Sequence, residues 1–587
     1  MKTTNGPDKD KLSVKKRSVV HFLLTGILAL LIIGILILSW VPPVSRDALT
    51  HHLAVPKLYL QHGGITEIPS VLFSYYPMNL DFLYIIPLYF GNDIVPKLIH
   101  FSFALLTAWL IYGYLKKRLG TVWAIFGAIF FLSLPIIVKL SITVYVDLGL
   151  IFFSTAALMS LLKWIQKRFE LKFLILSAVC CGLALGTKYN GLVVLLILTL
   201  FIPFVYIRIS KTSSHTKDLT QNVSPGRIQF KAVGSAVIFV FIALLVFSPW
   251  MIRNYIWMSN PIYPLYDQIF NRNIPLSNDS QMDPQILGSD SGSQLTSEAK
   301  PKPWGSFATR NVIYGESWWE IALIPVRIFF QGRDNSPKHF DGKLTPFLLL
   351  LPLFAFFQNA GQSSALRIEK RIFLFFAILF VLYTFCTTSI RIRYIAPILP
   401  PLVILSAFGF HNLVCVFTKH LPKGFLKTCI VVFGIALFAY NGAYIVQQFN
   451  YVQPFSYISG QLDRDAYIEK YRPEYAVYQY ANRHLPDSSK IMGLYLGNRR
   501  YYSDRELIFG VSAFQESVHQ TDSPQVLFMD LKENGYTHVI VRFDLFNWWA
   551  EKQLGAAKKE MLQAFFVAYL EPIFSKNGYG LFALKTI

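Results

Sequence analysis

The chain has 587 residues, of which 53% are hydrophobic and only 15% are charged. Soluble domains contain about 25% charged residues, and the mean hydropathy here is +0.41, so an ordinary soluble protein is excluded. The net charge of +21 does not indicate nucleic-acid binding, because the basic residues lie in short clusters between apolar runs. Lysine and arginine are enriched in this way in cytoplasmic loops of membrane proteins. We therefore expect membrane lipids, and no nucleic acid, among the partners.

The chain begins with a polar, basic tail at residues 1–18, which we expect to be disordered and cytoplasmic. The apolar run after it is too long for a signal-peptide core and lacks a small-residue cleavage site. Runs of about 20 apolar residues, each long enough to cross a bilayer as a helix, recur along the chain. We predict a polytopic α-helical membrane protein with about eleven transmembrane helices, at 19–40, 94–115, 121–140, 143–164, 172–187, 190–207, 232–251, 345–358, 371–388, 395–415 and 427–449.

The basic clusters give the orientation of these spans. They fall on alternate loops, on the same side as the N-terminal tail, which is the cytoplasmic side by the positive-inside rule. The loops 41–93 and 252–344 and the segment 450–587 then lie on the outer face. We predict a catalytic transmembrane domain at 19–449 in the plasma (inner) membrane and an extracytoplasmic domain at 450–587.

The C-terminal segment has a different pattern from the rest of the chain. A helix at about 473–484, an apolar run at 491–496, a second helix at 523–534 and a β-branched run at 537–543 predict a small α/β domain. No glycine-rich phosphate loop accompanies these elements, so we assign no nucleotide to it.

The outer loop 41–93 begins with an acidic and histidine-rich segment. Asp47 follows a Pro-Pro turn, and the residues from Asp47 to His62 have the mixed apolar and polar pattern of a helix lying in the membrane interface. A second such helix is predicted at 79–90. As a carboxylate at this place, Asp47 fits a base that deprotonates or orients an acceptor hydroxyl or amine. It also fits the N-cap of the interfacial helix.

Other polar residues of the same loop are candidates for substrate contacts. His51 lies four residues after Asp47 and shares a helix face with it, whereas His52 diverges from His51 by about 100°. We predict that His51 and Lys57 contact the substrate, together with Tyr394 further along the chain. No HExxH-type cluster is present, so no metal ligand is assigned.

Four ionisable residues interrupt apolar runs close to the predicted outer face. Asp147, in TVYVDLGL, is a functional candidate, or else a buried partner for Lys139 or Lys188. Lys188 in GTKYNG, and Arg391 and Arg393 in SIRIRYIAPILPP, lie at breaks between runs. They are either snorkelling cations or, since they lie on the face away from the positive side, groups that bind a lipid-linked phosphate.

In their order along the chain, these motifs resemble the GT-C glycosyltransferases of the protein O-mannosyltransferase and aminoarabinose-transferase type. The motifs are RDALTHHLAVPKLYLQHG, SITVYVDLGL, GTKYNG and RYIAPILP, followed by the tail YAVYQYANRHLPDSSKIMGLYLGNRRYYSDREL. The resemblance covers nearly the whole chain. It implies transfer of a sugar from a polyprenyl-phosphate donor to a glycan, lipid or protein acceptor on the outer face.

The same resemblance assigns roles to individual residues. Asp47 occupies the place of the catalytic aspartate of the first loop, and Asp147 matches the second acidic position. Lys188, Arg391 and Arg393 match contacts to the donor phosphate. Protein O-mannosyltransferases have an Asp-Glu pair where this chain has Asp47-Ala48, a departure that favours a polysaccharide, glycolipid or lipid acceptor. Some relatives bind a divalent metal, but the chain shows no ligand set for one.

Two other functions are compatible with a polytopic protein that has polar outer loops. A transporter or flippase of lipid-linked saccharides predicts inverted repeats and charges near the bilayer midplane, whereas this chain has no evident repeat and its candidate residues gather near one face. A polymerase or ligase takes a pyrophosphate-linked glycan and is expected to hold its key cations in the loop 252–344.

Overall fold

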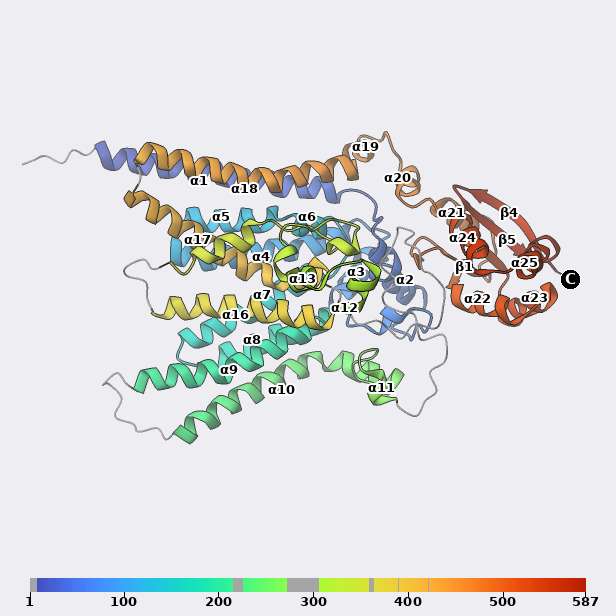
Figure 1. Cartoon of the computed structure of the whole chain (residues 1–587), viewed down its shortest axis with the longest axis horizontal. Coiled ribbons are helices and arrows are strands. Elements are labelled where there is room, and N and C mark those ends of the chain that lie inside the picture. Colours follow the sequence, from blue (N-terminus) through green and yellow to red (C-terminus); the bar gives the residue numbers. More distant parts are fainter. Residues whose placement is uncertain are drawn as a thin grey trace, which may run out of the picture.

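The computed structural model describes residues 8–214, 225–271, 306–357, 364–388, 390–420 and 422–586. The first seven residues of the basic tail and residues 272–305 of the second outer loop lie outside the described residues. The described chain forms a long bundle of helices with a smaller sheet domain at one end (Figure 1). The helical part contains the residues predicted as the transmembrane domain, and the sheet domain forms the C-terminus.

Seven helical segments of the described chain are long and apolar enough to cross a membrane. They lie at Val19–Ser39, Val95–Leu119, Asp147–Gln166, Gly191–Ser210, Gly226–Met258, Ser364–Thr387 and Ile392–Thr418. The helices that contain them are α1 (Asp8–Ser39), α4 (Val95–Leu119), α7 (Asp147–Gln166), α9 (Gly191–Ser214), α10 (Pro225–Met258), α16 (Ser364–Thr387) and the pair η7 (Ile392–Ile398) and α17 (Leu399–His420).

The other predicted spans also form helices, with differences that have local causes. Helices α5 (Thr121–Ser133) and α6 (Pro135–Ser141) are together long and apolar enough for one span, but they are bent by 66° relative to each other, because a proline disfavours helical backbone in the residue before it. Helix α8 (Leu171–Thr187) has 17 residues, and α18 (Lys423–Val452) has 30. The span predicted at 345–358 forms only α15 (Phe347–Phe354), which at about 12 Å is too short to cross the bilayer core.

Short helices gather at one end of the bundle, between the long helices and the sheet domain (Figure 1). The first outer loop forms the π-helix η1 (Ala48–His52), α2 (Ala54–Gln61), η2 (Leu72–Tyr75) and α3 (Asn79–Tyr89). The second forms α11 (Asp267–Phe270), α12 (Ser306–Ala308), η5 (Thr309–Ile313), α13 (Trp318–Ala322), α14 (Ile324–Arg327) and η6 (Pro337–His339). Both helices predicted in the first loop are therefore present, and the outer loops meet at the same end.

The C-terminal domain contains the predicted sheet. After α19 (Pro454–Ile458), its elements are α20 (Arg464–Tyr471), α21 (Tyr475–His484), β1 (Lys490–Leu494), β2 (Glu506–Phe509), α22 (Val511–Gln520), α23 (Pro524–Glu533), β3 (His538–Arg542), α24 (Phe543–Gln553), α25 (Ala556–Tyr569), β4 (Leu570–Lys576) and β5 (Tyr579–Leu584). The strand order is β2-β1-β3-β5-β4, with β1 parallel to β2 and β3, and β5 antiparallel to β3 and β4.

Both faces of this sheet are covered. Met492 and Val539 point into a core formed with α22 to α25, whereas their neighbours Ile491 and Ile540 point into a second core formed with α21. This alternation follows from the two-residue period of a strand. Of the eleven elements after α19, four match the helices and apolar runs predicted from the sequence.

Candidate active site

A cavity of about 1140 Å³ opens at the end of the bundle that carries the C-terminal domain. Its walls come from the end of α1 and the segment after it, from α6, from residues 320–343, from η7, and from one side of α18. Asp47, Arg391 and Arg393 line it, as does Arg472 from the start of the C-terminal domain. Three of the predicted residues, from two separate motifs, therefore share one site.

The lining of the cavity is strongly basic. Ten lysine and arginine residues line it against four aspartate and glutamate residues. The cations are Arg46, Lys97, Lys139, Arg327, Arg333, Lys338, Lys343, Arg391, Arg393 and Arg472, and the acids are Asp47, Glu320, Asp334 and Asp341. Such a site attracts anions, and guanidinium groups in particular suit phosphate oxygens.

Asp47 forms an ion pair with Arg393 on the wall of this cavity. The guanidinium Nη1 of Arg393 donates to the Oδ2 of Asp47, and the two side chains are 14% and 22% exposed. Burial raises the pKa of Asp47, but Arg393 and His51 outweigh this effect and hold the pKa below its ordinary value. The Asp47 side chain caps no helix nitrogen. Asp47 therefore stands at the N-cap position of η1 without a capping hydrogen bond from its side chain, and it faces the cavity as an ionised carboxylate.

The two histidines after Asp47 lie together, although they were expected to diverge. The π-helical turn changes the spacing of side chains around the helix, as the bond from the Leu53 N–H to the Ala48 carbonyl shows. The rings of His51 and His52 are 4.0 Å apart between centroids. His51 stacks on Phe73 at 4.2 Å and does not line the cavity.

His52 makes a buried contact with Asp81, a residue that the sequence analysis did not single out. The His52 Nδ1 lies 2.7 Å from the Asp81 Oδ1. Burial lowers the pKa of His52 to about 4, and burial raises the pKa of Asp81 to about 7. Near neutral pH, His52 is uncharged and Asp81 holds much of the proton in this pair.

Asp147 and Lys188 form a second ion pair, behind the cavity wall. The Nζ of Lys188 lies 2.7 Å from the Oδ1 of Asp147, whose side chain is 1% exposed. Neither residue lines the cavity. The ring of Tyr394, which does not line the cavity either, is close to the cation of each pair: the Lys188 Nζ is 5.5 Å and the Arg393 guanidinium carbon 5.4 Å from its centroid.

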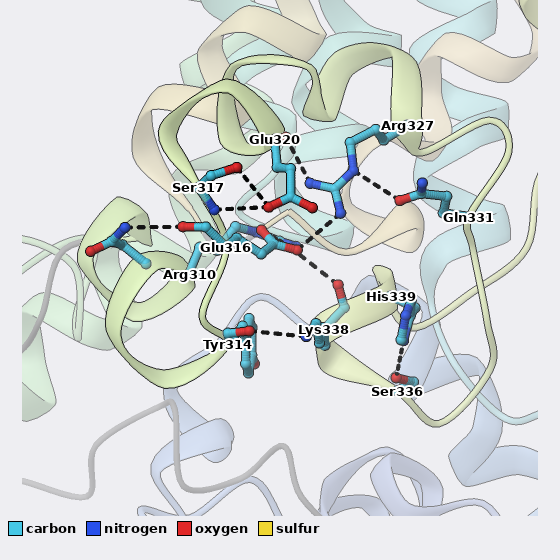
Figure 2. Close-up of polar contacts among 11 residues, drawn as sticks. Arg310, Tyr314, Glu316, Ser317, Glu320, Arg327, Gln331, Ser336, Lys338 and His339 are labelled. Carbon is cyan, nitrogen blue, oxygen red and sulfur yellow. Dashed lines mark hydrogen bonds and ion pairs between the residues drawn. The ribbon is translucent and has the colours of Figure 1, made fainter.

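The second outer loop folds around the buried carboxylate of Glu316 (Figure 2). Its oxygens lie 3.0 Å from Arg310 Nη1 and 3.1 Å from Arg327 Nη2. Glu320 accepts hydrogen bonds from both the backbone and the side chain of Ser317, which begins α13. Because a buried carboxylate needs such partners, Glu316 fixes the path of the loop and with it the position of Arg327 in the cavity wall.

Several cavity residues were missed in the sequence. Lys139 of α6 lies 3.1 Å from Asp334 and 3.3 Å from Asp341, and Arg391 lies 3.8 Å from Asp341. Lys343 lies over the ring of Tyr440, 4.8 Å from its centroid. The signal that would have found Asp334, Asp341 and Lys343 is the run RDNSPKHFDGK at 333–343, where charges alternate with turn residues.

The C-terminal domain holds the segment that contains Asp47. The backbone N–H groups of Arg500 and Tyr501 both donate to the Leu49 carbonyl at 3.1 Å, and the Tyr502 hydroxyl donates to the Pro43 carbonyl at 2.7 Å. Lys57 points away from the cavity and donates to the Tyr501 carbonyl at 2.8 Å, and lies 2.7 Å from Asp504. The bonds to Pro43 and Leu49 flank Asp47 on both sides.

A metal does not fit the described residues. Within the described part of the chain, no group of three or more histidine, cysteine, aspartate or glutamate side chains is placed to hold an ion. The acids of the cavity are paired with cations or helix donors instead.

The helical bundle, the basic outer cavity and the terminal sheet domain define a polytopic membrane protein with its polar site at one end. Residues 87–219 match the family model described as Dolichyl-phosphate-mannose-protein mannosyltransferase. The matched segment contains Asp147 and Lys188 but neither Asp47 nor Arg393. No curated protein matches the chain by sequence.

Two solved structures are similar over nearly the whole chain. One is ArnT from Cupriavidus metallidurans bound to undecaprenyl phosphate, with 14% identity, coverage of 96% of this chain and 97% of that one, and a TM-score of 0.51. The other is the archaeal oligosaccharyltransferase AglB from Archaeoglobus fulgidus with an inhibitory peptide and a dolichol-phosphate, with 10% identity, coverage of 95% and 74%, and a TM-score of 0.50. These likenesses confirm the predicted GT-C fold and, with the family segment, support the predicted class of membrane glycosyltransferases.

Proposed function

We propose that the protein is a membrane glycosyltransferase that moves a sugar from a polyprenyl-phosphate donor to an acceptor on the outer face. The observation that carries the proposal is the basic cavity with Asp47 and Arg393 in its wall. The solved structures of ArnT and AglB, which share the fold, contain undecaprenyl phosphate and dolichol-phosphate, respectively. A polyprenyl phosphate has an anionic group that can bind the cations of this cavity and an apolar chain that can stay in the membrane.

In the proposed reaction, the bond between the sugar and the phosphate oxygen breaks, and a bond from the sugar to the acceptor oxygen forms. The proton of the acceptor hydroxyl passes to the Asp47 carboxylate. The leaving polyprenyl phosphate gains negative charge, which Arg393 and Arg391 stabilise from fixed positions. A donor phosphate beside Arg393 also offsets the field of that cation at Asp47, which raises the basicity of the carboxylate when the donor is bound.

The predicted roles of the other residues differ in how well the geometry supports them. Arg391 lines the cavity next to Asp341 and is placed for the donor phosphate. Lys188 and Asp147 stand behind Tyr394, and we propose that they position Arg393 and do not touch the donor. We propose that His51 supports Asp47 and that Lys57 joins the C-terminal domain to α2.

We further propose that the protein lies in the inner membrane with its N-terminus in the cytoplasm and its C-terminal domain outside. The support is the alternation of basic loops in the sequence and the gathering of both outer loops and the C-terminal domain at one end of the bundle (Figure 1). The donor lipid then enters from the outer leaflet, and the acceptor comes from the aqueous side.

A second candidate function has one observation in its favour. Four of the ten cavity cations, Arg327, Arg333, Lys338 and Lys343, belong to the second outer loop. Cations in this loop were the feature expected of a polymerase or ligase that takes a pyrophosphate-linked glycan. The other six cations, among them Arg391 and Arg393, come from elsewhere in the bundle, so we rank this function second.

The test is sugar transfer by the purified protein, supplied with a panel of polyprenyl-phosphate sugars and, in parallel, polyprenyl-pyrophosphate glycans. Wild type is compared with Asp47→Asn, and with Asp544→Asn as a control in an exposed ion pair of the C-terminal domain. Transfer from monophosphate donors that is lost only in Asp47→Asn supports the proposal. Transfer from pyrophosphate donors alone favours the second function, and passage of lipid-linked saccharide across vesicles without any transfer favours a transporter.

A further inference from the structure

One face of α18 lines the cavity without contributing a charge. Its polar cavity residues, at spacings of one or two helical turns, are Tyr440, Tyr444, Gln447, Gln448 and Tyr451, and the apolar Val452 lines the cavity at the end of the helix. Tyr444 and Gln448 are buried, whereas Gln447 and Tyr451 lie toward the rim. This α18 stripe, defined by these five residues, offers only phenol and amide groups, in contrast to the cationic walls around it.

The two glutamines of the α18 stripe have unused hydrogen-bonding capacity. Across the residues that the structure describes, neither the Gln447 nor the Gln448 side-chain amide has a hydrogen-bond partner, although Gln448 is 8% exposed. An amide both donates and accepts, so it can pair with adjacent hydroxyl groups of one molecule. Tyrosine rings add flat apolar surface beside the amides. A sugar ring, with hydroxyls on its edge and C–H groups on its faces, fits this combination.

The α18 stripe is joined to the phosphate-binding side of the cavity by a chain of polar contacts. The Tyr444 hydroxyl donates to Asp334 at 2.6 Å, and Asp334 lies 3.1 Å from Lys139. Lys139 also contacts Asp341, the partner of Arg391. A sugar bonded directly to a phosphate needs its subsite to adjoin the cations that hold the phosphate, and the stripe has this placement.

The charges of the lining also restrict which sugar fits. Each of the four acidic residues already has a partner: Asp47 pairs with Arg393, Asp334 and Asp341 with Lys139, and Glu320 with Ser317. In contrast, no described carboxylate forms an ion pair with Lys343 or Arg333. An ammonium group on the sugar would meet no free carboxylate and would be repelled by the ten cations.

We propose that the α18 stripe is the subsite of the transferred sugar, and that this sugar is uncharged and does not bear a free amine. The inference rests on the proposed function and extends it to the substrate class. Gln448 and Gln447 hold the sugar hydroxyls, and Tyr451 covers the ring at the rim. The stripe adds affinity for the sugar and leaves the binding of the polyprenyl phosphate unchanged.

The experiment measures equilibrium binding of three lipids to the purified protein in nanodiscs. They are undecaprenyl phosphate, an undecaprenyl-phosphate hexose, and an undecaprenyl-phosphate aminopentose. The test variant is Gln447→Leu/Gln448→Leu, and the control is Val446→Ala, which is on the same helix but exposed on its outer side. We expect wild type and control to bind the hexosyl lipid more tightly than the bare lipid, and the aminopentosyl lipid no more tightly than the bare lipid.

The test variant is expected to lose about tenfold in affinity for the hexosyl lipid, the scale of two net hydrogen bonds, with unchanged affinity for undecaprenyl phosphate. An equal loss for the bare lipid would overturn the subsite, since the stripe would then act on the phosphate or on the fold. Preference of wild type for the aminopentosyl lipid would overturn the charge argument. Failure of wild type to bind any of the three lipids overturns the proposed function itself, and is distinguished from the other results by the bare lipid.

Discussion

Two carboxylate–cation pairs lie close to Arg393 and Tyr394, and they differ in whether they face the cavity. Asp47 and Arg393 face a large water-accessible cavity, and both side chains are partly exposed. Asp147 and Lys188 lie outside the cavity lining, with the Lys188 Nζ 5.5 Å from the centroid of the Tyr394 ring and Asp147 nearly fully buried. In the sequence both pairs look alike, as charges at the ends of apolar runs. The difference teaches that a charged residue near a membrane surface can act on the substrate or can position other residues. Only the structure, by showing whether the side chain faces the cavity, distinguishes the two roles.

The largest effect on the rate of sugar transfer is expected when the carboxylate of the cavity pair, Asp47, is replaced. Asp47→Asn keeps the size of the side chain but removes the base, so sugar transfer should fall by about 10²- to 10⁴-fold, the contribution of a positioned general base. The rate of transfer from a polyprenyl-phosphate donor measures this effect. Thermal unfolding serves as the control, since the partly exposed pair contributes little to stability. Undiminished transfer would assign the role of the base to another carboxylate of the cavity, such as Asp341.

Breaking the buried pair Asp147–Lys188 should mainly lower the free energy of unfolding, whereas breaking the cavity pair should mainly lower the rate of sugar transfer. Lys188→Met leaves the Asp147 carboxylate buried without its cation and should cost about 3–5 kcal/mol in the free energy of unfolding. The double variant Asp147→Asn/Lys188→Met removes both charges and should recover most of this loss. Denaturant or thermal unfolding of the purified protein measures both. If the double variant folds well but transfers as poorly as Asp47→Asn, the pair takes part in the chemistry and the contrast between the two regions fails.

The sequence predicted much of this arrangement, for reasons that can be traced to particular residues. Asp47, Arg391 and Arg393 were found because charges beside apolar runs are costly and therefore conspicuous. Asp81 was not found and Lys139 was considered only as a partner of Asp147, because their actual partners are distant in the chain. Asp341 was not assigned to the site, although it lies in the charged run at 333–343. The π-helical turn was not predicted either, because the sequence was interpreted with the 3.6-residue period of an α-helix. For that reason His51 and His52 were expected to diverge.

A third pair, His52–Asp81, is expected to affect how the stability of the protein depends on pH. Between about pH 4 and 6.5 the folded pair holds one proton on Asp81, and the unfolded chain holds one on His52, so the two contributions to stability offset each other. His52→Gln leaves only Asp81, which keeps a proton up to about pH 7 in the folded state but loses it near 3.8 when unfolded. Stability of this variant should therefore fall as pH rises from about 4 to 7.

The matched variant should show the opposite sign. In Asp81→Asn, the unfolded His52 binds a proton below pH 6.5 that the buried ring accepts only near pH 4. Stability of Asp81→Asn should fall as pH decreases through this window. Unfolding temperatures at a series of pH values measure both slopes. Equal slopes in the two variants would show that the pair does not share a proton as described.

The smallest expected effect concerns the support of the cavity pair by the C-terminal domain. Tyr502→Phe removes the hydroxyl that donates to the Pro43 carbonyl, a loss of about 0.5–1.5 kcal/mol. Because this bond flanks Asp47, we expect kcat to fall several-fold while KM for the donor stays the same. Tyr480→Phe is the control, since Tyr480 stacks on Phe574 on another side of the domain. A rise in KM without a change in kcat would assign Tyr502 to binding instead.

The bonds from Arg500 and Tyr501 to the Leu49 carbonyl have a further consequence. They make the backbone next to Asp47 and the backbone of the C-terminal domain parts of one hydrogen-bonded unit. Energetic coupling between two sites is reciprocal, so a ligand that shifts the Asp47 segment must also change how often these amides open to water. Hydrogen exchange at residues 500 and 501, outside the cavity, would then report whether the cavity is occupied, without any knowledge of the acceptor.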